Sequence, residues 1–236
     1  MLLGSHGVQR TGRFASFPPV TLWVWERPDD VRKLDPHRYA VAYLAETIVI
    51  RDGVTTTVRR EPLLVAPDAR LVAVVRIEAR PGTADLSDPE LPGVIAGMIA
   101  AWAHEKGTAA VQVDFDATRS QRLFYARMLG ALRNRLPVRL PLSITALASW
   151  CAFDDWIASL PVDEAVPMFF RMGPDHPPSR TSGWRYPIRE PLCRNTVGLS
   201  TDEAWPDLQP GTRLYVFHPR PWNPVALTNL EHSLGL

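Results

Sequence analysis

The sequence predicts a single α/β domain folded as a small or irregular TIM-type (β/α)8 barrel. Its 236 residues, 46% of them hydrophobic, match the roughly 200 to 250 residues over which such a barrel buries one core. Eight short apolar segments follow one another, and eight is the number of strands in the barrel. The segments are residues 20–25, 39–46, 71–79, 109–114, 142–146, 165–170, 194–199 and 213–217. The barrel is expected over residues 18–236, after a disordered or extended lead-in over residues 1–17.

Two crossover helices are predicted between these segments. Residues 88–105 carry apolar side chains at helical spacing, and Gly107 follows where a C-cap residue is expected. Residues 121–136 show the same spacing and end at Pro137. The apolar positions are Leu91, Ile95, Met98, Ile99 and Trp102 in the first helix, and Leu123, Phe124, Met128, Leu129 and Leu132 in the second.

The remaining connections leave little room for helices. Short helices are expected at residues 30–34 and 153–160. Residues 48–58 are typical of a β-hairpin in place of a helix, because Asp52-Gly53 suits the positive φ angles of a type I′ turn. The barrel is therefore expected to be minimal or irregular.

Composition and motifs argue against several functions. The 26 Lys and Arg nearly balance the 25 Asp and Glu, which disfavours a nucleic-acid partner. No run of about 18 apolar residues predicts a membrane span, and the first residues lack the apolar core of a secretory signal. The sequence has no P-loop, GxGxxG, HExxH or GxSxG motif, so we expect no cofactor and no metal. The oligomeric state cannot be read from the sequence.

Cys151 and Cys193 are the two cysteines, and they permit one disulfide at most. A bridge requires their Cα atoms to lie within about 7 Å and an oxidising compartment. It would favour the periplasm or cell envelope over the cytoplasm. Free buried cysteines are the alternative.

Polar and apolar side chains alternate at the end of the fourth predicted strand. Successive side chains of a strand point to opposite faces, so the polar set faces the barrel interior and the apolar set the helix layer. The polar set is Gln112, Asp114 and Asp116, and the apolar set is Val111, Val113 and Phe115. The alternative role for the two aspartates is to cap the next helix or satisfy buried donors. Thr118 and Gln121 already fit a capping box there.

Two neighbouring strands add charged groups to the same rim. Arg76 and Glu78 share the polar parity of the third strand, and Glu46 ends the second strand in the same way. We expect them to converge with Asp114 and Asp116 at the C-terminal mouth, where barrel enzymes place their chemistry. Close carboxylates raise at least one pKa, and acid/base catalysis uses such a difference. The alternatives are a structural ion pair for Arg76 and Glu78, and an ordinary rim charge for Glu46.

Aromatic side chains are also expected around the mouth. Trp25, Trp150 and Trp222 lie at or beyond predicted strand ends, where flat rings can stack on sugar faces. Their clustering carries this prediction, because a single Trp is usually a core residue. For His218 a structural role is the alternative, since no second His or Cys is placed to share a metal. The expected substrate-binding set is Glu46, Arg76, Gln112, Trp25, Trp150, Met168, Arg171, His218 and Trp222.

Several long stretches resemble a bacterial family known as domain of unknown function 3142. They are VAYLAETI, LVAVVRIEA, VQVDFDATRSQRLFYARML, LPLSITALASWC, VPMFFRMG and VGLSTDEAWP, and they extend over most of residues 20–222. That family has no established activity, so the resemblance implies no chemistry.

A more distant similarity is to the chitinases of glycoside hydrolase family 18, whose fourth barrel strand ends in D-x-D-x-E. Gln112, Asp114 and Asp116 fall on these three positions. The similarity implies Asp116 as the proton donor and Asp114 as its orienting partner, and Met168 and Trp222 resemble sugar-site positions. This chain departs from the pattern twice, because Asp is one methylene shorter than Glu and Gln112 replaces a carboxylate.

The sequence therefore predicts a glycoside-hydrolase-like barrel that acts on a polysaccharide or glycoconjugate. Asp116 is the expected general acid, Asp114 its electrostatic partner, and Glu78 or Glu46 a second carboxylate. The alternative is a non-catalytic carbohydrate-binding or cell-envelope interaction protein, which needs the Trp residues and tolerates Asp116→Asn. In both cases the expected ligand is a carbohydrate or another small polar molecule.

Overall fold

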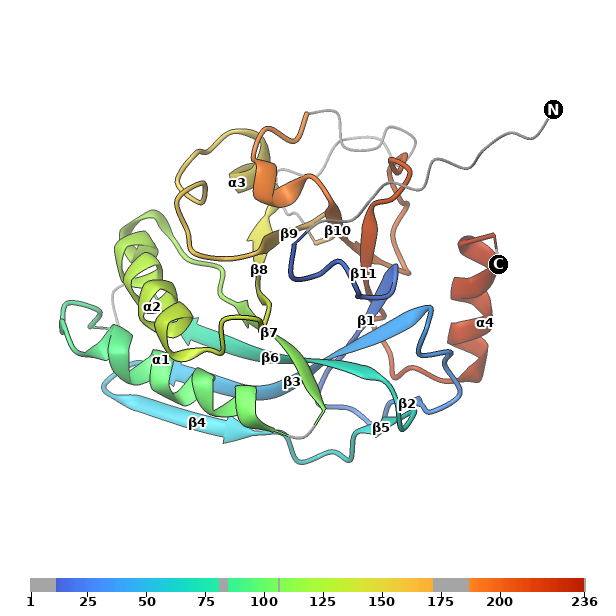
Figure 1. The fold of residues 1–236 in the computed structure, drawn as a ribbon, viewed down its shortest axis with the longest axis horizontal. Helices are drawn as coiled ribbons and strands as arrows, with labels where there is room; N and C mark the ends of the chain where they lie inside the picture. The colour runs from blue at the N-terminus through green and yellow to red at the C-terminus, as the bar shows by residue number, and fades with distance from the viewer. Residues whose placement is uncertain (1–11, 81–84, 106, 172–186, 236) are drawn as a thin grey trace.

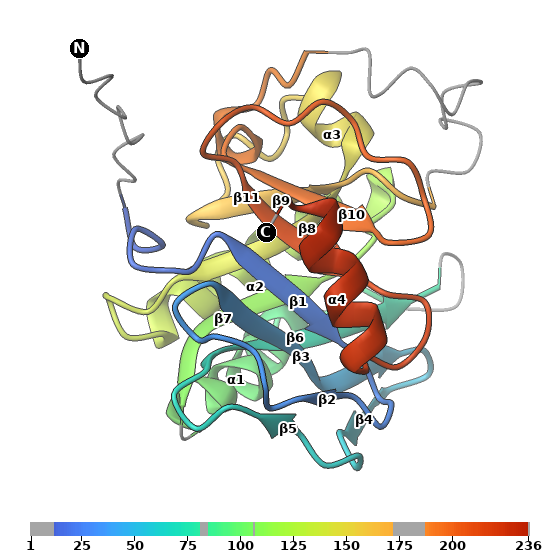
Figure 2. The ribbon, with the colours of Figure 1, turned by 90° about the vertical axis from the view of Figure 1, so that its right-hand side faces the viewer.

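Eight parallel strands form a closed barrel (Figures 1 and 2). The computed structural model describes residues 12–80, 85–105, 107–171 and 187–235. β1 pairs with β3 on one side and with β11 on the other, which closes the barrel. The strands are β1 (Val20–Val24), β3 (Tyr39–Ile50), β6 (Arg70–Ala79), β7 (Thr108–Asp114), β8 (Leu142–Leu147), β9 (Glu164–Met168), β10 (Thr196–Ser200) and β11 (Arg213–Phe217). The predicted TIM-type barrel is confirmed.

Both predicted crossover helices are confirmed. α1 (Leu91–Ala101), continued by the 3-10 helix η1 (Trp102–His104), joins β6 to β7. α2 (Arg122–Arg135), preceded by the 3-10 helix η2 (Arg119–Gln121), joins β7 to β8. These two helices lie side by side on the outside of the barrel (Figure 1).

The other helices are shorter or follow the last strand. α3 (Ala148–Ala152) comes directly after β8, and the 3-10 helix η4 (Pro191–Cys193) comes before β10. α4 (Pro224–Ser233) follows β11 and begins at an Asn223 side-chain cap. Its residues Ala226, Leu227 and Leu230 pack in the same outer cluster as residues of β1 and β11.

The two predicted short helices are wrong. Residues 30–34 contain β2 (Asp30–Val31), which pairs with β5 (Leu64–Val65) in a separate two-stranded sheet. The Asp30 side chain accepts hydrogen bonds from the backbone and side chain of Arg32, and such local bonds compete with a helix. Residues 153–160 form turns, and the helical residues lie earlier in the chain, in α3.

The predicted hairpin is confirmed, although its turn differs. β3 continues into the hairpin and pairs antiparallel with β4 (Val54–Val58), so that Ile50 lies opposite Val54. The connection is residues 51–53, one residue longer than a type I′ turn. Asp52 also lacks the positive φ of that turn, since Arg171 alone has a positive φ among the described non-glycine residues.

A buried layer inside the barrel closes its N-terminal end. Trp23 and Tyr215 lie in this layer together with Phe14 and Phe17, which belong to the expected lead-in. The guanidinium of Arg213 lies 4.4 Å from the centre of the Phe14 ring, and it forms a buried ion pair with Glu164. Residues 1–11 lie outside the described residues. With this end filled, the open end of the barrel is the one formed by the carboxyl ends of the strands.

No helix in the described part of the chain is both long enough and apolar enough to cross a membrane.

Candidate functional site

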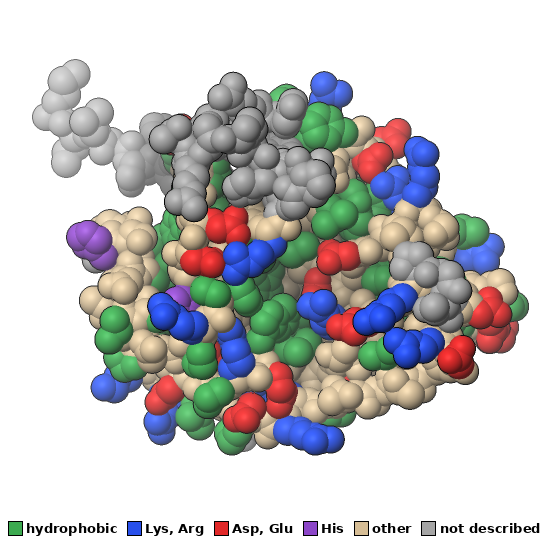
Figure 3. Space-filling view, turned by 180° about the vertical axis from the view of Figure 1, so that it is seen from behind, with side chains coloured by type: hydrophobic (Ala, Val, Ile, Leu, Met, Phe, Trp, Pro, Cys, Tyr) green, Lys and Arg blue, Asp and Glu red, His purple; other side chains and the backbone are tan. Residues whose placement is uncertain are grey.

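A pocket of about 370 Å³ opens at the carboxyl ends of the barrel strands. Its polar wall comes from β6, β7 and β8 and carries Arg76, Asp114, Asp116 and Thr145. Its aromatic side chains come from β9, β11, β1 and the residues that follow them. Because β7 and β11 are four strands apart in the closed barrel, the acidic and aromatic walls face each other. Figure 3 shows a face on which acidic and basic side chains border a hollow that also has hydrophobic side chains in its wall.

Asp114 is the buried carboxylate of the pocket. It ends β7, is 8% exposed, and its Oδ1 accepts a 2.7 Å hydrogen bond from Thr145 Oγ1 on β8. Its Oδ2 lies 3.6 Å from Arg76 Nη1 on β6. Burial raises the pKa of Asp114, and the charge of Arg76 and the Thr145 hydrogen bond offset only part of this rise. Two neighbouring strands therefore hold the carboxylate in one orientation.

Asp116 is the accessible carboxylate of the pocket. It follows β7 by two residues and lines the same wall with an exposed side chain. Partial burial in the concave wall raises its pKa, and the negative charge of Asp114 raises it further, against a smaller lowering by Arg76. The predicted capping box is present at η2, where Gln121 Oε1 accepts from the Thr118 backbone N–H at 2.8 Å. Asp116 is thus not needed as a helix cap.

Arg76 links the pocket to Glu78 on the rim. Arg76 Nε donates to Glu78 Oε1 at 3.0 Å, and the two side chains are 43% and 48% exposed. Both side chains lie on the inward-facing side of β6, as predicted, because the residues that alternate with them, Val75 and Ile77, pack in the outer core. Glu78 does not line the pocket in the described structure. It contacts the acidic wall only through Arg76.

Glu46 does not lie at the mouth, so this expectation is wrong. The register of β3 against β6 shifts between Leu44 and Glu46, which places Glu46 beside the outward-facing Val75. Its Oε2 there accepts a 2.9 Å hydrogen bond from Trp102 Nε1, just beyond α1. An irregularity of this kind reverses the parity of every residue after it, and the apolar pattern of the strand gave no sign of it.

Gln112 also lies outside the pocket, one layer deeper in the barrel. It is fully buried, accepts from Trp23 Nε1 at 2.8 Å and donates to Ser143 Oγ at 3.0 Å. Gln112 therefore supports the Trp23 ring, which lines the pocket, and does not contact the pocket as expected. Gly198 makes room for this ring, because a Cβ there would lie 2.9 Å from a Trp23 carbon.

Aromatic and sulfur-containing side chains form the wall opposite the acids. Trp25 and Met168 line the pocket, as the sequence predicts. Phe170 and Phe217 stack with ring planes 3° apart and centroids 5.7 Å apart, and both also line it. A flat wall of this kind suits the face of a sugar ring.

Trp150 and Trp222 lie in the core, so their expected place at the rim is wrong. Trp150 is 2% exposed and packs edge-on against Trp156 in the outer layer. Trp222 is 1% exposed, and its Nε1 donates to the backbone oxygen of Trp23 at 3.0 Å. Each follows a strand end, but a position in the sequence does not show whether the side chain turns toward the mouth or under the helix layer.

Arg171 lines the pocket as predicted, whereas His218 lies outside it. Arg171 binds Asp202 and Glu203, each at 3.0 Å. His218 borders a separate cavity, where its Nδ1 is hydrogen-bonded to Thr201 Oγ1 and its ring packs on Trp222. Burial and nearby arginines lower the pKa of His218.

Six residues that line the pocket were not predicted from the sequence, namely Trp23, Thr145, Leu147, Ala148, Ser149 and Phe217. Trp23 shares the parity of Trp25 on β1, and Phe217 shares that of Tyr215 on β11, so strand alternation could have indicated both. Thr145 could have been found by the same alternation on β8. The short stretch Ala148 and Ser149, at the start of α3, carries no chemical signal in the sequence.

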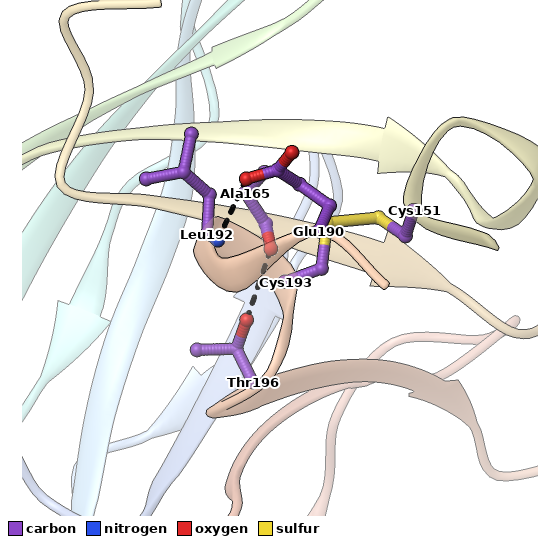
Figure 4. The surroundings of a disulfide bond; sticks show 6 residues. All are labelled: Cys151, Ala165, Glu190, Leu192, Cys193 and Thr196. Atoms are coloured by element: carbon purple, nitrogen blue, oxygen red, sulfur yellow. Dashed lines mark hydrogen bonds between the residues drawn. A yellow bond between two sulfur atoms is a disulfide. The ribbon is translucent and has the colours of Figure 1, made fainter. Parts of the chain in front are cut away.

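The predicted disulfide between Cys151 and Cys193 is present, with Cα atoms 5.9 Å apart. It joins α3, beside the pocket, to η4 (Figure 4). The Cys151 backbone oxygen also accepts hydrogen bonds from the backbone N–H groups of Arg189 and Glu190. The segment before β10 is thus attached to the end of α3 by one covalent and two hydrogen bonds.

The described residues contain no group of three or more His, Cys, Asp or Glu side chains that could hold a metal ion. The pocket brings together two carboxylates with raised pKa values, the guanidinium groups of Arg76 and Arg171, and an aromatic wall. Such groups can bind a polar ligand with flat faces and can exchange a proton with it.

The fold and this pocket define the protein as a TIM-type barrel with an acidic pocket at its strand ends. The model of the family described as "Domain of unknown function (DUF3142)" matches residues 68–167, which confirms the expected resemblance over this part of the 20–222 stretch. Among curated proteins, none matches the sequence.

Two solved structures are similar to the chain. One is the chitinase domain of the spore coat protein CotE from Clostridium difficile, with 15% identity and a TM-score of 0.43 over 64% of this chain and 49% of that one. The other is the spore cortex-lytic enzyme SleL from Bacillus cereus, with 15% identity and a TM-score of 0.49 over 94% and 59%. The matched regions thus span less than two thirds of either of those chains. At these values neither likeness bears on the function of this protein.

Proposed function

We propose that the pocket binds a carbohydrate and hydrolyses a glycosidic bond, with Asp116 as the general acid. The observation that carries this proposal is the pair of carboxylates with raised pKa values, Asp114 and Asp116, facing an aromatic wall across one pocket. Glycoside hydrolysis needs a protonated carboxyl group near the leaving oxygen and a surface that holds the sugar ring. The pocket size also falls within the range of about 300 to 1,000 Å³ that is typical of small-molecule sites.

Asp116 suits the role of proton donor because its carboxyl group is both accessible and easier to protonate than usual. A general acid works best when its pKa is near the working pH, and enzymes raise carboxyl pKa values by burial and by neighbouring like charges. Both causes act on Asp116. Its side chain is exposed on the pocket wall, so a leaving oxygen could approach it directly.

Asp114 suits a different role, because its carboxylate is fixed and almost inaccessible. Thr145 and Arg76 occupy one oxygen each. In this position a negative charge would raise the pKa of Asp116 before the reaction and stabilise the positive charge that develops on the sugar ring in the transition state. Asp114 would therefore act on the substrate electrostatically.

A screen followed by one substitution tests the proposal. Purified protein is incubated with chromogenic glycosides and with polysaccharides, and products are detected by absorbance and mass spectrometry. Asp116→Asn should retain folding and binding but lower kcat by about 10² to 10⁴, the usual contribution of a positioned acid. Asp52→Asn, in the exposed hairpin turn far along the chain from the pocket residues, is the matched control. Native turnover by the Asp116→Asn variant would show that the assigned role is wrong.

A non-catalytic carbohydrate-binding protein is the second candidate function. It is favoured by the position of Glu46 and Glu78, because neither lines the pocket and only Asp114 and Asp116 supply carboxylates to its described lining. For this candidate, Trp25→Ala would abolish binding, Asp116→Asn would bind normally, and no glycan would be cleaved. In either case the disulfide supports a location in the periplasm or cell envelope, because oxidising compartments maintain such bonds.

A further inference from the structure

A second cavity, of about 470 Å³, lies between α4 and the carboxyl ends of β10 and β11. Its lining includes Thr201, Asp202, Glu203, Trp205, His218 and Asn229. A further hollow of about 580 Å³ shares His218 and Asn229 with it and extends toward the start of α4. Together they form a groove along one side of α4.

An ion-paired arginine lies between this cavity and the acidic pocket. Arg171 lines the pocket, and its Nη2 and Nη1 lie 3.0 Å from Asp202 Oδ2 and Glu203 Oε1, which line the second cavity. Ser200 Oγ in turn donates to Asp202. Arg171 also has a φ of 54°, a backbone conformation that residues other than glycine adopt rarely. Arg171 and its two ion pairs therefore connect the linings of the two cavities.

The cavity presents the groups that a sugar ring would use. The half-buried Trp205 indole is held by a 2.9 Å hydrogen bond from its Nε1 to the Ser200 backbone oxygen. Glu203 Oε1 is paired with Arg171, and its Oε2 is buried with no hydrogen-bond partner among the described residues. His218 has Nδ1 committed to Thr201, so Nε2 remains for a ligand. A fixed ring beside polar side chains such as His218 and Asn229 matches the amphipathic surface of a sugar.

We propose that the second cavity is a carbohydrate subsite and that one oligosaccharide chain extends from the acidic pocket over Arg171 into it. The inference rests on the proposed function, because it assigns the pocket a glycan ligand. It goes further in substrate class: the ligand is a chain of several sugar units, and a terminal sugar or disaccharide fills only the pocket. Arg171 would contact the chain between the two cavities.

Affinity as a function of chain length tests the subsite. The probes are β-1,4-linked glucose and β-1,4-linked N-acetylglucosamine oligomers of two to eight units, titrated into the full chain by calorimetry. The octamer should bind more tightly than the dimer. Trp205→Ala should weaken octamer binding roughly 3- to 10-fold, the effect of losing one aromatic stacking contact, and leave dimer binding unchanged.

Two further variants keep the test decisive. Asn229→Ala, on the exposed face of α4, should weaken octamer binding in the same selective way if Trp205→Ala fails to fold. Leu123→Ala, a 62% exposed side chain on α2 outside both cavities, should change neither affinity. If dimer and octamer bind equally, or if the cavity variants leave octamer binding intact, the subsite is refuted while the proposed function stands. If no oligomer of either series binds, both the subsite and the proposed function are refuted.

Discussion

The half of the barrel built from β6, β7 and β8 and the half built from β9, β10 and β11 are covered in different ways. In the first, α1 and α2 pack against the strands through side chains such as Ile95, Ile99 and Leu129, which are all fully buried. In the second, the described segment before β10 has only the three-residue η4, attached to α3 by the disulfide and backbone hydrogen bonds. Two crossover helices cover the first half, whereas in the described part of the second half the cover is α4 together with the disulfide-linked η4.

The difference between the halves extends to the pocket. The helix-covered half supplies Arg76, Asp114, Asp116 and Thr145, and the other half, with β1, supplies most of the aromatic wall. The family model matches residues 68–167, which run from just before β6 to Pro167 in β9 and so cover the first half and one strand of the second. The carboxylates thus lie on the more regular scaffold, where strand pairing and helix packing fix their positions.

The largest expected effect on stability comes from a substitution that disrupts the packing of the helix-covered half. Leu129→Ala should lower the free energy of unfolding by about 2 to 5 kcal/mol, because it leaves a cavity in a fully buried cluster. Urea denaturation followed by circular dichroism measures it. Leu123→Ala, an exposed leucine on the same helix, should change stability by no more than about 0.5 kcal/mol. Equal losses in the two variants would contradict the assignment of α2 as a packed cover.

A somewhat smaller effect on stability is expected from removal of the disulfide in the other half. Replacing both Cys151 and Cys193 by Ala should lower the free energy of unfolding by about 2 to 4 kcal/mol, since the bond closes a loop with a sequence separation of 42 residues. A reducing agent should destabilise the native protein in the same way and leave the double variant unaffected. Denaturation curves with and without reductant measure this. A native protein that is insensitive to reductant would show that the bond does not hold this half.

The smallest expected effect is the pH-dependent change in stability caused by Asp116→Asn. The pKa of Asp116 is raised above 3.8 in the folded protein, so ionisation destabilises the fold as the pH rises through the window between 3.8 and the raised value. Asp116→Asn, which cannot ionise, should therefore be more stable than the native protein at neutral pH. The gain should vanish below about pH 3.8. Denaturation between pH 3.5 and 8 measures it, and Asp52→Asn serves as the control. A gain that is independent of pH would rule out this origin.

The structure separates what strand alternation can predict from what it cannot. Arg76, Glu78, Asp114 and Asp116 all point inward as the sequence predicts, because the register shift between β6 and β7 lies at the start of both strands, before Val72 and Ala110. Glu46 has the opposite parity, because the register shift before it adds one residue. The aspartates could thus be placed from the alternation of apolar residues, but Glu46 could not.

Side chains beyond the strand ends were harder to place. Trp25, Met168 and Arg171 line the pocket, while Trp150, Trp222 and His218 turn away from it. The direction of the last three depends on partners distant in the sequence, such as the bond from Trp222 to the Trp23 backbone. The ion pairs of Arg171 with Asp202 and Glu203 are likewise contacts between separate loops.

The sequence by itself determined the eight-stranded barrel, its two long crossover helices, and the side of β6 and β7 that carries charge. These features follow from local periodicity, because apolar residues at spacings of two and of about 3.6 select strands and helices. The tertiary structure alone decided which rings and charges share the pocket with the two aspartates. That selection depends on the register of neighbouring strands and on the packing of loops, and both are set by contacts between segments far apart in the chain.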